Sequence, residues 1–225
     1  MAICPVDCDC VDLDALAAIT PPAIVVLGER HADKPDLKLA AKAVTRLAMT
    51  APVTVALEAV DARKQAAMDQ LGDGTLKPKQ VEPATDWSST WGHAFKPYVA
   101  VFKAGAKADA SFVGAGLPIG PAPEDRELRV PERYVTELGQ TAVQHGMDPN
   151  VFANSMAWRD VAIAEASLEG WSGEGYLVIL TGRGHVTDGL GVPWQIREGA
   201  LSDVAVHPYL LASEGCATGD GVLTK

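Results

Sequence analysis

The sequence predicts an α/β protein: a single domain whose mostly parallel sheet is flanked by helices. Two observations support this fold class. Short apolar runs of strand length alternate along the chain with longer amphipathic runs of helical spacing. Several apolar runs also end in glycine or in a polar side chain. Because open α/β sheets bind ligands at the carboxyl ends of their strands, we expect the functional site at that edge of the sheet.

The predicted elements follow one another in this alternation. The first strand is Ala23–Leu27, and Pro35 lies in the first turn of the helix that follows it. The second strand, Val53–Leu57, ends at Glu58. Further helices are expected at 62–71, 97–106, 132–145 and 149–169, and further strands at 111–115, 176–180 and 204–206.

Composition limits the class of protein and its partners. With 225 residues, 48% of them hydrophobic and 21% charged, the chain fits a folded globular protein. Its net charge of −10 argues against nucleic acid or an anionic membrane as the main partner. No apolar run approaches the ~18 residues of a membrane span. The first residues do not resemble a signal peptide, so we expect a cytoplasmic protein or, alternatively, a processed extracytoplasmic one.

We expect a Cys/Asp-rich arm at residues 1–20, the α/β domain at 21–212 and a tail at 213–225. The arm holds Cys4, Cys8 and Cys10, and Cys216 is in the tail. The arm lacks the Cys-x-x-Cys pair that is usual in zinc sites, and its aspartates would raise the pKa of the thiols. Incidental thiols are the simplest interpretation, and a disulfide to Cys216, a redox role or a metal role are the alternatives.

A short motif occurs twice, each time after an apolar strand. The first copy is Gly28-Glu29-Arg30-His31 and the second is Gly182-Arg183-Gly184-His185. Glycine permits a sharp exit from the sheet, and the histidine is then carried to the carboxyl end of the strand. Two such histidines from opposite ends of the chain predict a shared site for a metal, a cofactor or catalysis.

Carboxylates are expected beside these histidines. Glu29 lies within the first motif, and Glu58 directly follows a buried strand. A buried carboxylate needs a cation, a metal or hydrogen-bond donors, so either a functional partner or a structural salt bridge is expected at Glu58. Together, two imidazoles and two carboxylates suit a divalent metal or acid–base chemistry.

Arg159 and Asp160 interrupt an otherwise apolar helix face. They either orient the glutamates and histidines or a ligand's carboxylate, or form a buried pair that fixes the helix. Trp91 and Tyr98 suit packing, and they also suit contact with a flat cofactor. The other three histidines, which are expected to be ordinary surface or core residues, are His93, His145 and His207.

The order of these motifs resembles the ChaN-like haem-binding uptake family, within the wider erythromycin esterase/ChaN/TIKI–TraB group. The segments that carry the resemblance are Val26–His31, Ala56–Glu58, Trp91 with Tyr98, Trp158–Asp160, and Gly182–His185 followed by Gly191-Val192-Pro193. The resemblance implies an α/β domain that binds haem or iron and forms dimers, in an iron-uptake lipoprotein. It places Glu29, His31, Glu58, Asp160 and His185 in the shared pocket, with Trp91, Tyr98 and Arg159 as further cofactor-binding candidates.

Two function classes follow, and the sequence leaves open whether the protein is an enzyme. The first is a haem- or iron-binding protein. The second is a metal-dependent hydrolase of peptides or esters, in which His31, Glu58 and His185 hold the metal or position water and Glu29 is the general base. A non-catalytic domain that keeps the pocket only for folding is the third interpretation.

Overall fold

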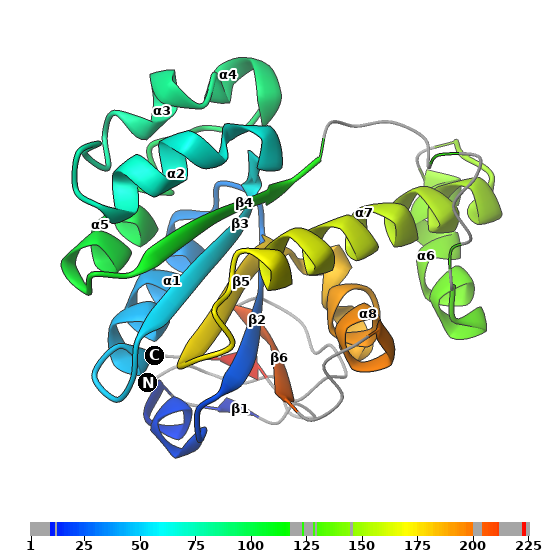
Figure 1. The fold of residues 1–225 in the computed structure, drawn as a ribbon. Coiled ribbons are helices and arrows are strands. Elements are labelled where there is room, and N and C mark those ends of the chain that lie inside the picture. The colour runs from blue at the N-terminus through cyan, green and yellow to red at the C-terminus, as the bar shows by residue number, and fades with distance from the viewer. Residues whose placement is uncertain are drawn as a thin grey trace.

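A computed structural model describes residues 10–11, 13–117, 123, 128, 130–144, 146–199, 204–211 and 222–223. Within these residues seven strands form one sheet in the order β1-β7-β6-β2-β5-β3-β4, and every pairing is parallel (Figure 1). The strands are β1 (Cys10–Val11), β2 (Ala23–Glu29), β3 (Val53–Asp61), β4 (Ser111–Gly116), β5 (Tyr176–Gly182), β6 (Ala205–Leu211) and β7 (Val222–Leu223). The predicted α/β class with a parallel sheet is confirmed.

Helices cover both faces of this sheet. Figure 1 shows α1 and α5 on one side and α7 and α8 on the other. The α-helices are α1 (Lys34–Leu47), α2 (Gln65–Gly72), α3 (Val81–Ala84), α4 (Trp87–Thr90), α5 (Val99–Lys107), α6 (Glu132–Gln144), α7 (Pro149–Glu169) and α8 (Val192–Gly199). Short 3-10 turns are η1 (Leu13–Ala18), η2 (Ala62–Lys64), η3 (Arg183–His185) and η4 (Thr187–Gly189). In the described part of the chain, no helix has the length and apolar character needed to cross a membrane.

Alternate residues of the central strands enter two different cores. Val25 and Leu27 of β2 pack into the core that contains α1 and α5. Ile24 and Val26 pack into the core that contains α7 and α8. A strand that is buried on both faces must be apolar at every position, which is why the strands are visible in the sequence as uninterrupted apolar runs.

The strands that carry the candidate site extend further than predicted. The strands β2 and β5 continue to Glu29 and Gly182, and β3 continues past Glu58 to Asp61. The pairing of β3 with β4 shifts register between Leu57 and Asp61, which is the mark of a β-bulge. The predicted end of this strand at Leu57 was therefore wrong, because Glu58 is a buried polar residue within the strand and not the first residue of a loop.

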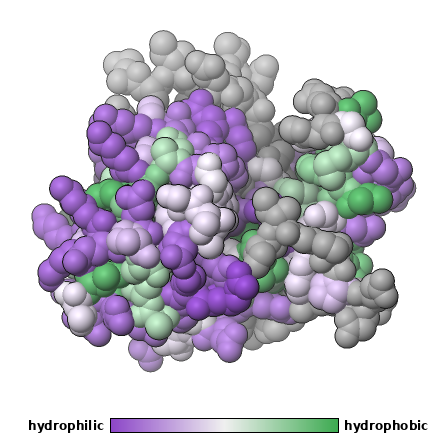
Figure 2. Space-filling model, turned by 90° about the horizontal axis from the view of Figure 1, so that it is seen from above, coloured by the Kyte–Doolittle hydropathy of each residue, from purple (hydrophilic) through white to green (hydrophobic). Residues whose placement is uncertain are grey.

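The surface seen from above is mostly hydrophilic, with hydrophobic residues gathered on the side where α6 lies (Figure 2). Three exposed hydrophobic residues fall in this part of the chain: Val143, Met147 and Val151. The predictions that concern Cys4, Cys8, Cys216 and His145 fall outside the described residues.

Candidate functional site

The two Gly-x-x-His motifs meet at the carboxyl ends of β2 and β5. These strands are direct neighbours, and Glu29 pairs with Gly182 in the parallel register. A Cβ atom on Gly28 would lie 3.1 Å from the Cα of Arg183, and one on Gly182 would lie 2.6 Å from Cε1 of His31. Each glycine therefore leaves room for the other motif, and the two turns pack directly against each other.

The first cluster of the site surrounds Glu29, which is 2% exposed. The Nδ1 atom of His31 lies 2.8 Å from Glu29 Oε1, and the hydroxyl of Tyr98 donates a hydrogen bond of 2.7 Å to the same oxygen. Trp91 Nε1 donates to the Tyr98 hydroxyl at 3.2 Å. We call these four residues the Glu29 network.

Two atoms of the Glu29 network have no hydrogen-bond partner among the described residues. The first is Glu29 Oε2, which is buried. Among the described residues no hydrogen bond reaches Nε2 of His31, whose side chain is 32% exposed. Buried polar groups are nearly always hydrogen-bonded, so an unpartnered carboxylate oxygen beside an open imidazole nitrogen is the feature expected of a ligand site.

Aromatic rings flank the open side of His31. The Trp91 ring lies 4.8 Å from the His31 ring in an edge-on contact, and the His93 ring lies 4.7 Å from it. Partial burial and the nearby His31 lower the pKa of His93. We predicted His93 to be an ordinary surface or core residue; it is exposed, and the structure also brings it beside the site. Its position two residues after Trp91 was a usable signal for this.

Tyr98 is held as a hydrogen-bond donor. Burial, together with the negative charge of Glu29, raises its pKa well above the usual value. Its hydroxyl also accepts a hydrogen bond of 3.3 Å from the backbone nitrogen of Ala32, in the turn that follows His31. Tyr98 thus fixes both the carboxylate and the turn that carries the histidine.

The second cluster surrounds Glu58, and its carboxylate is fully partnered. Oε2 accepts 2.7 Å hydrogen bonds from the Thr181 hydroxyl and from the backbone nitrogen of Gly182. Oε1 is paired with Arg159 and lies 3.3 Å from Nε2 of His185. Glu58 lies within the bulge of β3, and Gly116 of β4 allows the close approach there, because a Cβ on it would lie 2.1 Å from the Glu58 carbonyl oxygen.

His185 is held between two carboxylates. Its Nδ1 atom lies 2.6 Å from Asp160 Oδ1, and Asp160 Oδ2 accepts a hydrogen bond from the Tyr134 hydroxyl. We call Glu58, Arg159, Asp160, His185, Thr181 and Tyr134 the Glu58 network. Arg159 contacts Glu58 and Asp160 contacts His185. The sequence had left open whether these two residues orient the glutamates and histidines or a ligand's carboxylate, or form a buried pair that fixes the helix.

The charges of the Glu58 network stabilise one another. Burial alone would lower the pKa of His185, but Glu58 and Asp160 raise it to about 10. Burial alone would raise the pKa of Glu58, but His185 and Arg159 hold it well below the usual value. Burial raises the pKa of Asp160 despite its contact with His185. At neutral pH the histidine is an imidazolium ion with both N–H groups occupied.

This geometry does not suit a divalent metal held by His31, Glu58 and His185. A metal ligand needs a free lone pair, and both nitrogens of His185 face carboxylate oxygens, at 2.6 Å and 3.3 Å. Both oxygens of Glu58 are likewise occupied. Within the described residues no group of three or more His, Cys, Asp or Glu side chains is arranged to hold a metal. The set of His31, Glu58 and His185 as metal ligands therefore stays a prediction.

Two members of the Glu58 network were not identified from the sequence. Thr181 lies directly before Gly182, so its position next to the second motif was a usable signal. Tyr134 comes from α6, outside any recognised motif, and nothing in its spacing indicates the contact with Asp160.

The fold and these two networks define an α/β protein with a carboxylate–histidine site at the carboxyl edge of a parallel sheet. Residues 15–122 match the family model described as haem-binding uptake, Tiki superfamily, ChaN. The resemblance to the ChaN-like haem-binding uptake family that the motifs predict is confirmed. The matched range contains the Glu29 network and Glu58, whereas Arg159, Asp160 and His185 lie beyond it.

Solved structures of low sequence identity share the fold. One is described as cofacial haem binding to ChaN of Campylobacter jejuni; it is 17% identical, has a TM-score of 0.71, and the match covers 93% of this chain and 88% of that one. The type III effector HopBA1 is 14% identical with a TM-score of 0.58, over 94% of this chain and 91% of that one. No curated protein sequence matches the chain.

Proposed function

We propose that the protein binds haem at the Glu29 network, with Nε2 of His31 as the axial ligand of the iron. The observation that carries the proposal is the open Nε2 atom of a ring whose Nδ1 atom is held by a buried carboxylate. A carboxylate that accepts a hydrogen bond from one ring nitrogen fixes the tautomer of the imidazole. It also makes the other ring nitrogen a stronger metal ligand. Histidine is also the most common axial ligand where haem is held by one side chain.

The residues around His31 fit a flat aromatic group. Trp91 and His93 lie against the His31 ring and are partly or largely exposed. Tyr98 does not fit the role of axial ligand, because its raised pKa disfavours the phenolate and its hydroxyl donates to Glu29. When bound, haem supplies an iron centre with a further coordination position. The chain orients His31 through Glu29, Tyr98 and the Ala32 turn.

Two similarities point to the same ligand. The description of the matching family model names haem-binding uptake. The description of the ChaN structure from Campylobacter jejuni names cofacial haem binding. Neither similarity identifies an axial ligand in this chain, so the assignment to His31 depends on the geometry of the Glu29 network.

The direct test is a titration of the purified protein with haemin, followed by the Soret absorption band. The wild type is expected to give a saturable Soret shift, and His31→Ala is expected to remove the histidine-ligated spectrum. His207→Ala is the matched control, since His207 is partly buried in β6 and pairs with Val25 in mid-strand. No Soret shift in the wild type contradicts haem binding, and an unchanged spectrum in His31→Ala contradicts the ligand assignment.

A second candidate, hydrolysis of an ester or peptide, is favoured by one observation. Glu29 Oε2 is a buried acceptor, and it and Nε2 of the neighbouring His31 have no hydrogen-bond partner among the residues that the structure describes. Such a dyad can take a proton from water during attack on a carbonyl group. Turnover of a p-nitrophenyl ester that is lost in Glu29→Gln, with and without added zinc, would support this candidate. Equal rates for the two proteins would exclude it.

A further inference from the structure

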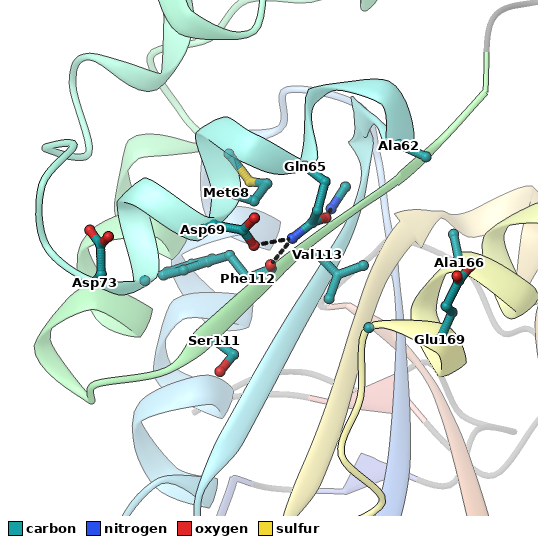
Figure 3. A pocket seen from close by; sticks show the side chains of 13 residues that line it. Ala62, Gln65, Met68, Asp69, Asp73, Ser111, Phe112, Val113, Ala166 and Glu169 are labelled. Atoms are coloured by element: carbon teal, nitrogen blue, oxygen red, sulfur yellow. Dashed lines mark hydrogen bonds between the residues drawn. The ribbon is translucent and has the colours of Figure 1, made fainter.

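A cavity lies along the edge strand β4, away from both the Glu29 network and the Glu58 network. Its volume is about 730 Å³, and it is bounded by α2, β4 and the carboxyl end of α7. Figure 3 shows Gln65, Met68 and Asp69 of α2 on one side and Ala166 and Glu169 of α7 on the other. This cavity is part of neither network, and the proposed haem site does not use it.

The floor of the cavity is the free edge of the sheet. Within the described part of the chain, strand β4 stands last in the strand order and pairs only with β3. An edge strand presents backbone N–H and C=O groups that can pair with another strand, and proteins usually protect such an edge. Here α2 and α7 flank the edge, and the space between them is the cavity.

The side chain of Gln65 occupies two of the backbone hydrogen-bonding groups of this edge. Gln65 Nε2 donates to the carbonyl oxygen of Phe112 at 2.9 Å, and the backbone nitrogen of Gly114 donates to Gln65 Oε1 at 3.0 Å (Figure 3). In a parallel pair, the carbonyl of one residue and the N–H two residues later contact the N–H and the C=O of a single residue of the neighbouring strand. The Gln65 amide therefore takes the place of the N–H and C=O groups of one residue of an adjacent strand.

The charge of the residues that line the cavity indicates what kind of segment would replace the Gln65 amide at the strand edge. The charged residues among those that line it are all acidic: Asp69, Asp73 and Glu169, and each is exposed. Pairing of two copies of the protein through β4 would bring these carboxylates close to their counterparts. A strand that carries lysine or arginine would instead meet opposite charges on both walls.

We propose that this groove, formed by β4, α2 and α7, binds an extended basic peptide segment, which adds a strand to β4 in place of the Gln65 amide. Main-chain hydrogen bonds to β4 would provide affinity, as in other cases of strand addition at a sheet edge. The acidic walls would select basic side chains. The proposal is independent of haem binding.

The test is fluorescence anisotropy with labelled hexapeptides of alternating sequence. A Lys-Val repeat is expected to bind, and a Glu-Val repeat is expected not to bind. Gln65→Ala is expected to tighten binding about fivefold to tenfold, because the competing amide is removed. Gln70→Ala, an exposed glutamine of the same helix, is the matched control.

A second variant keeps the test independent of Gln65. Asp73→Asn combined with Glu169→Gln is expected to weaken the Lys-Val peptide about tenfold at low salt, with little effect at high salt. Peptide binding is also expected to slow hydrogen exchange at the Gly114 amide. Failure of the Lys-Val peptide to bind, equal binding of the Glu-Val peptide, or conversion of Gln65→Ala into a dimer by sedimentation would each overturn the proposal.

Discussion

The Glu29 and Glu58 networks are built from the same kinds of group, a carboxylate, an imidazole and a phenol, and they differ in what is left open. In the Glu58 network both carboxylate oxygens and both imidazole nitrogens have partners. In the Glu29 network one carboxylate oxygen and one imidazole nitrogen have none among the described residues. The two networks lie on either side of Gly182, where a Cβ would be 2.9 Å from His31 Nε2 and 3.6 Å from Glu58 Oε2.

This difference assigns different roles to two histidines that look equivalent in the sequence. His185 is buried and charged, and it joins β3, β5 and α7 through Glu58 and Asp160. His31 is partly exposed, and no hydrogen bond reaches its Nε2 atom within the described residues. The comparison therefore predicts that one histidine mainly affects folding and the other mainly affects binding.

The largest expected effect is on stability. His185→Gln leaves two buried carboxylates without their shared cation, and breaking a buried ion pair in this way costs about 3–5 kcal/mol. His31→Gln removes one half-exposed hydrogen bond and is expected to cost about 1 kcal/mol or less. Urea unfolding of the two variants beside the wild type measures both. Equal losses would show that the two networks do not differ as described.

The next largest expected effect is a pH dependence of the free energy of unfolding, caused by the titration of His185. Its pKa is about 10 in the folded protein and 6.5 in the absence of these contacts, so folding takes up a proton between these values. The stabilisation is fully present below pH 6.5 and is lost as pH rises toward 10. Between pH 7 and 10 the free energy of unfolding should fall by about 1 kcal/mol per pH unit. The same scan on His185→Gln should lack this slope; a parallel slope in the variant would assign it to another group.

Glu29→Gln is expected to weaken haemin binding about 10–100-fold while leaving the fold intact, because the side chain that orients His31 loses its charge. Haemin titration measures the affinity, and urea unfolding checks the fold. Glu82→Gln, at an exposed glutamate of α3, is the control. Unchanged affinity in Glu29→Gln would mean that the carboxylate does not act on the histidine.

The smallest expected effect concerns Arg159, which is 21% exposed and contacts Glu58 through one of its terminal nitrogens. Its other N–H groups can bind a carboxylate of the ligand, such as a haem propionate. Arg159→Lys should reduce the preference for haemin over haemin dimethyl ester about fivefold, since a lysine lacks the planar fork. If the ratio of the two affinities stays constant, Arg159 has no contact with the propionates.

The sequence predicts that the site residues come together at one edge of the sheet, because their positions depend on short sequence patterns near each strand end. Parallel strands of matching register bring Glu29, Glu58 and His185 to one edge. The bounds of α7 are those predicted, because Asp148 caps its first turn, Pro149 begins it and Gly170 ends it. Such signals lie within a few residues of the feature they determine.

The partners within the site could not be predicted, because they depend on packing between distant segments. The contact of Asp160 with His185 requires the position of α7 over the sheet, and the contact of Tyr134 with Asp160 requires the position of α6. The β3 bulge has no sequence signal apart from a buried glutamate. The two-residue strands β1 and β7 are too short to show any periodicity.

The assignment of His31 as the ligand histidine is tested most directly by replacing its ring with a free one. In His31→Gly the cavity left by the side chain should accept imidazole from solution. The variant with haemin should lack the histidine-ligated Soret spectrum, and millimolar imidazole should restore it, whereas His185→Gly should not respond in this way. A wild-type spectrum in His31→Gly without imidazole would contradict the account.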